Sequence, residues 1–129
     1  MKEPQQTCCG VGGPKIKSSK RTPTFAKKIN MIIYNVTVSV DEDVAEKWLK
    51  WMREIHIPEV MATGYFVSSR LCRVIGGTEN GITYATQYEC ESLAKMQQYE
   101  TKAAPALRAD HQKHFEGKTV AFRTLLETL

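Results

Sequence analysis

Apolar and polar residues alternate with a period of two near both ends of the region formed by residues 31–129. Residues 32–40 read IIYNVTVSV, and Val120, Phe122 and Leu126 recur within residues 118–126. A period of two directs successive side chains to opposite faces of an extended backbone. Both segments are therefore predicted to be half-buried β-strands.

Two stretches between these strands have the spacing of helices. The first has an apolar stripe at i, i+4, i+7, i+8 and i+11, formed by Val44, Trp48, Trp51, Met52 and Ile55. Asp41 is expected to cap this helix, and Pro58 to end its regular part near His56 or Ile57. In the second stretch, Ser92 is the expected cap, Pro105 should break or kink the helix, and Gly117 should end it. Its predicted buried residues are Leu93, Met96, Ala103 and Leu107.

A β-hairpin is predicted between the two helices. Residues 65–75 and 82–90 are its strands, and Asn80-Gly81 supplies the left-handed conformations of its turn. The resulting order is strand, helix, strand, strand, helix, strand. This order predicts an α+β fold, a ferredoxin-like βαββαβ sandwich with a four-stranded antiparallel sheet and two helices on one face.

The alternation also assigns side chains to the two faces of this sheet. Those expected beneath the helices are Ile32, Tyr34, Val36, Val38, Val40, Ile82, Tyr84, Tyr88, Val120 and Phe122. Those expected on the other face are Ile33, Asn35, Thr37, Thr83, Ala85, Gln87, Thr119, Ala121, Arg123 and Leu125. A sheet face with so few charges suits packing against a second sheet. We therefore expect a homodimer.

Charge divides the chain of 129 residues into two parts. Residues 1–30 contain seven Lys or Arg and one Glu, a net charge of +6, whereas residues 31–129 carry −2. The first part is rich in Gly, Pro, Lys and Ser, which predicts a disordered basic tail, and residues 31–129 are predicted to be a single domain. Either Met31 is the native start and the tail an upstream extension, or the tail is an arm that contacts acidic surfaces. Nucleic-acid binding is disfavoured except through this tail.

Cysteine use and hydropathy bear on the compartment. Cys8 and Cys9 are adjacent, no Cys-x-x-Cys spacing occurs, and the hairpin register places Cys72 opposite Ala85, too far from Cys90 for a disulfide. No signal peptide or membrane span is evident. We expect reduced thiols, a cytoplasmic protein and no membrane partner.

Several runs resemble the bacterial domain-of-unknown-function 4286 family. They are MIIYNVTV (31–38), WLKWMREIHIPEVMATG (48–64), QYECESLA (87–94), APAL (104–107) and GKTVAFRTLLE (117–127). The resemblance covers Met31 to Leu129, and it implies no catalytic residues because the family has no assigned activity. The His-x-Pro segment and the strand order are also similar to dimeric α/β-barrel proteins. That group includes cofactor-independent oxygenases, haem-degrading enzymes and proteins without known chemistry.

His56 is the first candidate for chemistry, although no catalytic residue is assigned. In a cavity between helix and sheet together with Tyr34, Trp51 and Tyr84, an imidazole that titrates near neutral pH is suited to act as a general base or to bind an acidic ligand. The alternative is that its ring packs at the helix end and bonds a backbone carbonyl. His111 and His114 share a helical spacing of three, but without a convergent third ligand no metal site is predicted.

Two functions remain open, and the sequence does not decide whether the protein is an enzyme. The first is a non-catalytic homodimeric binding or regulatory domain. The alternative is a cofactor-independent oxygenase-like enzyme, or a binder of haem or a small aromatic ligand, that uses a pocket near His56. No cofactor is predicted, with haem entering only under the alternative. A cavity of a few hundred Å³ beside His56 would favour the alternative, and a filled interior would favour the first.

Overall fold

The computed structural model describes residues 30–76 and 81–129, so the predicted basic tail up to residue 29 and Asn80 in the hairpin turn lie outside the described residues. The strands are β2 (Ile32–Val40), β3 (Phe66–Arg73), β4 (Ile82–Cys90) and β5 (Thr119–Glu127). The helical segments are η2 (Glu42–Val44), α2 (Ala45–Trp51), η3 (Met52–His56), α3 (Ile57–Ala62), α4 (Leu93–Lys102) and α5 (Ala104–Phe115).

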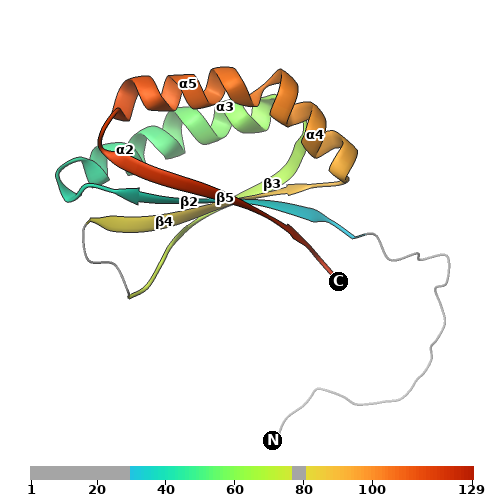
Figure 1. The fold of residues 1–129 in the computed structure, drawn as a ribbon, viewed down its shortest axis with the longest axis horizontal. Helices are drawn as coiled ribbons and strands as arrows, with labels where there is room; N and C mark the ends of the chain where they lie inside the picture. The colour runs from blue at the N-terminus through green and yellow to red at the C-terminus, as the bar shows by residue number, and fades with distance from the viewer. Residues whose placement is uncertain (1–29, 77–80) are drawn as a thin grey trace, which may run out of the picture.

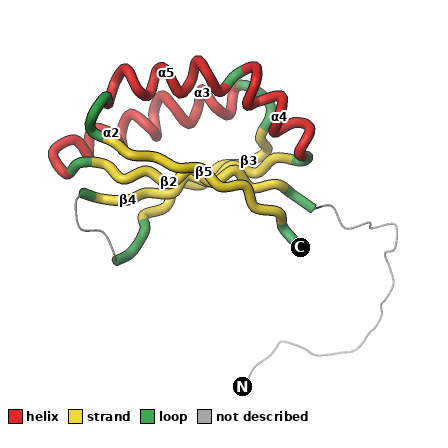
Figure 2. Tube along the Cα trace, viewed as in Figure 1, coloured by secondary structure: helices red, strands yellow, loops and turns green. Residues whose placement is uncertain are grey.

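The four strands form one antiparallel sheet in the order β3-β4-β2-β5. The labelled helices all lie on one side of this sheet, and within the described residues the other side carries none (Figures 1 and 2). The first and last strands of the predicted pattern, β2 and β5, are neighbours although they are far apart in sequence. The predicted α+β, ferredoxin-like arrangement is confirmed.

The faces of β2 and β4 agree with the alternation, but the predicted phase of β5 was wrong. Thr37 pairs with Phe122, and Val36 pairs with Arg123. Directly opposite residues in an antiparallel pair point to the same face. Phe122 and Val120 therefore lie on the bare face, where they are 61% and 74% exposed. Thr119, Ala121, Arg123 and Leu125 lie on the helix side instead.

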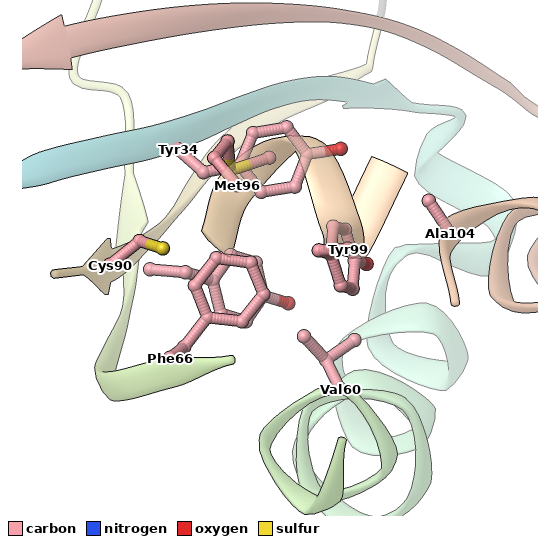
Figure 3. Close-up of a cluster of buried hydrophobic side chains, with 8 residues drawn as sticks. Tyr34, Val60, Phe66, Cys90, Met96, Tyr99 and Ala104 are labelled. Carbon is pink, nitrogen blue, oxygen red and sulfur yellow. The ribbon is translucent and has the colours of Figure 1, made fainter. Parts of the chain in front are cut away.

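The core beneath the helices consists of two clusters. The first cluster contains Tyr34, Val60, Phe66, Tyr88, Cys90, Met96, Tyr99 and Ala104 (Figure 3). The second cluster contains Val38, Val40, Ala45, Trp48, Trp51, Met52, Tyr84 and Phe115. Both predicted tryptophan anchors are thus buried, and Trp48 is fully so. β2 contributes side chains to both clusters, because the strand runs beneath both.

The first helical region passes through Pro58 without the end of the regular helix that was predicted near His56 or Ile57. A proline ring collides with the carbonyl four residues earlier in a regular α-helix. Here a π-helical turn, η3, precedes the proline, and α3 continues to Ala62. A π turn adds one residue to the helix and rotates the residues after it about the helix axis. Ile55, predicted to be buried, is consequently 43% exposed, whereas His56 is half-buried and Val60 is buried.

The second helical region begins and breaks where predicted. Ser92 Oγ accepts a hydrogen bond from the Lys95 backbone N–H at 3.1 Å, and the helix breaks at Ala103, two residues before Pro105. Leu93 is the exception, because it is exposed rather than buried. Asp41 precedes the first helical segment as expected, but its side chain makes no capping hydrogen bond.

The hairpin brings its predicted residues together. Cys72 pairs with Ala85, and both Cys72 and Cys90 are free thiols. Gly81 adopts φ +90, and a Cβ there would lie 2.3 Å from the carbonyl oxygen of Val40. The turn therefore requires glycine at this position, both for its backbone angle and for the close approach of β2.

Candidate functional site

A cavity of about 220 Å³ lies between the sheet and the helices. Its walls draw on both core clusters, so it interrupts the core between them. The sheet contributes Tyr34, Val36, Val38, Thr86, Tyr88, Thr119, Ala121 and Arg123. The helices contribute Trp48, Met52, His56, Tyr99, Leu107, Arg108, His111 and Gln112. The cavity lining is therefore mixed, with apolar side chains and polar groups contributing in similar measure.

Two of the four candidate ligand-binding residues line this cavity. Tyr34 reaches it from β2, and His56 reaches it from η3. Trp51 lies behind His56, with the two rings stacked at 5.0 Å between centroids. Tyr84 is stacked on Trp48 at 4.9 Å and is not part of the lining. The four residues therefore lie near one another, but Trp51 and Tyr84 support the wall rather than form it.

His56 is held between aromatic rings. Besides stacking on Trp51, its ring lies 5.9 Å from that of His111, edge to face. Burial, followed by the neighbouring His111, lowers the pKa of His56 to about 4. At pH 7 this imidazole is therefore neutral, a state that the sequence alone does not determine. Its Nδ1 atom is buried and has no hydrogen-bond partner among the described residues.

His111 connects α5 to the first helical segment. The indole Nε1 of Trp48 donates a hydrogen bond to Nε2 of His111 at 2.9 Å. Burial, followed by the positive charge of Arg123, lowers the pKa of His111. An unprotonated Nε2 is what the hydrogen bond from Trp48 requires, so His111 is neutral in this arrangement.

Two arginines converge on the hydroxyl of Tyr34 at the cavity wall. Arg108 donates to Tyr34 Oη from Nη2 at 2.9 Å, and Arg123 donates to the same oxygen from Nε at 3.1 Å. Arg108 Nη2 also bonds both carboxylate oxygens of Glu100, at 2.8 and 2.9 Å. The guanidinium of Arg108 is therefore neutralised by Glu100. Within the described residues Arg123 has no such carboxylate partner.

Three of the five buried side-chain polar atoms that have no partner in the described part of the chain belong to lining residues, namely His56 Nδ1, Thr86 Oγ1 and Arg108 Nε. The other two, Asn35 Oδ1 and Trp51 Nε1, belong to residues outside the lining. Leaving a buried donor or acceptor unpaired costs about 1–3 kcal/mol. Tyr88 and Tyr99 also belong to the cavity lining. Burial raises the pKa of both phenols, which therefore stay protonated.

Several lining residues were missed from the sequence. Arg123 was assigned to the wrong sheet face because the larger apolar residues of β5, Val120 and Phe122, were expected to be buried. Thr86 lies between Tyr84 and Tyr88 in the alternation, so the sequence does place its side chain on the helix side of the sheet. Nothing in the sequence indicates that its hydroxyl is unpaired among the described residues. Arg108 follows Leu107 on a broken helix, where the sequence does not fix the rotation of the second half.

Within residues 30–76 and 81–129, no group of three or more His, Cys, Asp or Glu side chains is arranged to hold a metal ion. No helix in these ranges is both long enough and apolar enough to cross a bilayer.

The family model described as Domain of unknown function (DUF4286) matches residues 31–129. The chain belongs to the DUF4286 family. The match begins at the first residue of the predicted domain and ends at the last residue of the sequence. The family itself carries no assigned activity, and no curated protein matches the chain.

Solved structures share the fold of this DUF4286 protein at low sequence identity. A putative antibiotic biosynthesis monooxygenase from Nitrosomonas europaea has a TM-score of 0.59 and 9% identity, covering 77% of this chain and 90% of its own. SnoaB, a cofactor-independent oxygenase from Streptomyces nogalater, has a TM-score of 0.55 and 11% identity, covering 75% and 91%. A dimeric ferredoxin-like protein from an uncultured marine organism has a TM-score of 0.50 and 8% identity, covering 78% and 95%. At these identities the likeness concerns the fold alone.

Proposed function

We propose that this DUF4286 protein binds a small molecule with a single ring in the cavity beside His56. The observation that carries the proposal is that three of the five unpaired buried polar atoms of the described residues, on His56, Thr86 and Arg108, belong to residues that line one cavity. Such atoms are costly in a folded protein unless a ligand or water satisfies them. A purely structural core would be expected to avoid them.

The size of the cavity supports a ligand of one ring. Cavities that accept drug-sized molecules typically measure about 300–1,000 Å³, and one of about 150 Å³ holds benzene. A volume of about 220 Å³ therefore suits a substituted six-membered ring. Haem, a macrocycle of four pyrrole rings, would require the helices to move apart, so we do not include it in the proposal.

A thermal-shift screen tests this proposal with single-ring acids, phenols and quinones, and with flavins and haem as larger comparators. Ala121 lines the cavity, so Ala121→Phe should fill it and abolish the shifts produced by single-ring compounds. Ala94 is exposed on α4, and Ala94→Phe is the matched control that should keep them. Shifts that survive Ala121→Phe would place binding elsewhere and contradict the proposal.

Proton abstraction by His56 is a second candidate function. His56 lines the cavity, and its neutral imidazole has one nitrogen without a partner among the described residues, so it is able to accept a proton. Its low pKa makes it a weak base, which restricts it to strongly acidic protons. This chemistry needs no cofactor, which fits the description of SnoaB. Oxygen uptake with the compounds found in the screen tests it. His56→Gln should abolish turnover and retain ligand binding, whereas binding without turnover in the unaltered protein would leave a non-catalytic binding domain.

The bare face of the sheet supports a homodimer. Val120, Phe122 and Leu126 are exposed there, on the strand next to β2, and exposed apolar patches commonly mark protein interfaces. A structural neighbour is described as a dimeric ferredoxin-like protein. We include face-to-face pairing of two copies in the proposed function. Sedimentation velocity at micromolar concentration tests it, and a strict monomer would contradict it.

A further inference from the structure

Hydrogen-bond donors outnumber acceptors where Tyr34 meets the two arginines. Tyr34 Oη already accepts from Arg108 and Arg123, so its own O–H is directed elsewhere. Arg108 Nε is buried and unpaired among the described residues. Arg123 is exposed, and the hydrogen bond of its side chain in the described part of the chain comes from Nε, which leaves the terminal nitrogens available as donors. We call the part of the cavity formed by Tyr34, Arg108 and Arg123 the arginine corner. A ligand group that fits the arginine corner must therefore supply hydrogen-bond acceptors rather than donors.

The charge of the arginine corner is also defined. Glu100 neutralises Arg108 through a salt bridge of 2.8 Å, which leaves Arg123 as the uncompensated charge. Glu100 is not part of the cavity lining, and its negative charge is paired with that of Arg108. One net positive charge matches a monoanion. A phosphate dianion would need a further cation.

The lining residues outside the arginine corner determine what the rest of the ligand can be. Val36, Val38, Met52 and Leu107 offer apolar surface, and Trp48 adds an aromatic side chain to the lining. An arginine fork matches a planar carboxylate, because two N–H groups address two oxygens at once.

From this arrangement we infer that the ligand is an aromatic monocarboxylate. Its carboxylate is held by Tyr34, Arg108 and Arg123, and its ring lies against the apolar wall. This inference rests on the proposed function, because it names the chemical class of the molecule that the cavity takes.

Benzoate, benzamide and benzylamine are suitable probes, because they share one ring and differ in charge. Binding to the full chain at pH 7 is followed by calorimetry and by the fluorescence of Trp48, which lines the cavity. We expect benzoate to bind about tenfold more tightly than benzamide, and benzylamine not to bind. The preference should weaken as salt concentration rises.

Arginine variants test the assignment of the arginine corner. Arg123→Gln should bring benzoate and benzamide to within about twofold of each other, and Arg123→Lys should keep part of the preference because it keeps the charge without the fork. Arg53 is exposed on η3, away from the lining, and Arg53→Gln is the matched control that should keep the full preference. Melting curves of all variants verify that they are folded.

The outcomes separate this inference from the proposed function. Equal binding of benzoate and benzamide by the unaltered protein would overturn the carboxylate assignment and leave a single-ring site. The same holds if Arg123→Gln keeps the full preference. If no single-ring compound of any charge binds, the proposed function fails, and the inference fails with it.

Discussion

The indole N–H of Trp48 and the imidazole of His111, both of which line the cavity, are joined by a hydrogen bond of 2.9 Å that connects α2 to α5. Trp48 is fully buried, so its N–H has no access to water as a substitute partner. The two helices that enclose the cavity are therefore held by a contact whose loss cannot be compensated by solvent.

His111→Phe is expected to lower the free energy of unfolding by about 1–3 kcal/mol, because it keeps a ring but leaves the Trp48 donor unpaired. His111→Gln should cost less, since its side-chain oxygen can accept the same hydrogen bond. Urea denaturation measures both. His114 is exposed, so His114→Phe is the control and should cost little. Equal losses at positions 111 and 114 would contradict a special role for the Trp48 contact.

Stability should fall on acidification as His56 becomes protonated. The pKa of His56 is about 4 in the folded chain against 6.5 for an unperturbed histidine. Below pH 6.5 the unfolded state therefore takes up a proton before the folded state does. The contribution of His56 is fully present above pH 6.5 and is lost as the pH falls toward 4, by at most about 3 kcal/mol.

The comparison of His56→Gln with the unaltered protein isolates this effect. Burial also lowers the pKa of His111, and Asp110 partly offsets the lowering at both histidines. The variant should therefore keep some loss of stability between pH 7.5 and 4.5, but less than the unaltered protein. Urea midpoints across this range measure the difference. Parallel pH profiles of the two proteins would show that His56 does not titrate in this way.

How far the sequence predicts the site depends on the element concerned. Tyr34 was placed correctly because β2 is central and buried along one face, so its alternation is strict. The position of Arg123 was not predicted, because β5 is an edge strand whose largest apolar side chains lie on the bare face. His56 was identified as a candidate, but the π turn that directs it toward the sheet results from the local conflict between a helix and Pro58. The periodicity of apolar residues alone does not reveal the extra residue that a π turn inserts.

Thr86→Val is expected to raise stability by about 1 kcal/mol and to weaken ligand binding. Thr86 Oγ1 is buried without a partner among the described residues, so removing it removes a desolvation cost while the shape is kept. The matched control is Thr83→Val on the same strand, where the hydroxyl is paired with Ser39 at 3.0 Å and its loss should not stabilise. Thermal melts and calorimetry with benzoate give the two readouts. A destabilised Thr86→Val would indicate that the hydroxyl is already satisfied.

Gly81→Ala should be more destabilising than Gly64→Ala. Both glycines have positive φ, +90 and +85, so either substitution introduces strain of about 1–2 kcal/mol. At Gly81 the new Cβ would also lie 2.3 Å from the Val40 carbonyl oxygen, whereas at Gly64 nothing lies within 4 Å. The β2 and β4 backbones would have to separate at Gly81. Urea denaturation of both variants tests this, and equal losses would show that the turn relaxes without cost.

Phe122→Asp is expected to dissociate the proposed homodimer while leaving the fold intact. Phe122 is exposed on the bare face beside Thr37, so a carboxylate there disturbs no core contact but must be desolvated in a face-to-face dimer. Dimer affinity should fall at least about 30-fold, the effect typical of an interface hot spot. Leu93 is similarly exposed but lies at the start of α4, on the helix side, so Leu93→Asp should leave association unchanged. Sedimentation velocity across a range of concentrations distinguishes the two variants. If Leu93→Asp dissociates the protein and Phe122→Asp does not, the copies pair through the helices, and the bare face of the sheet is not the interface.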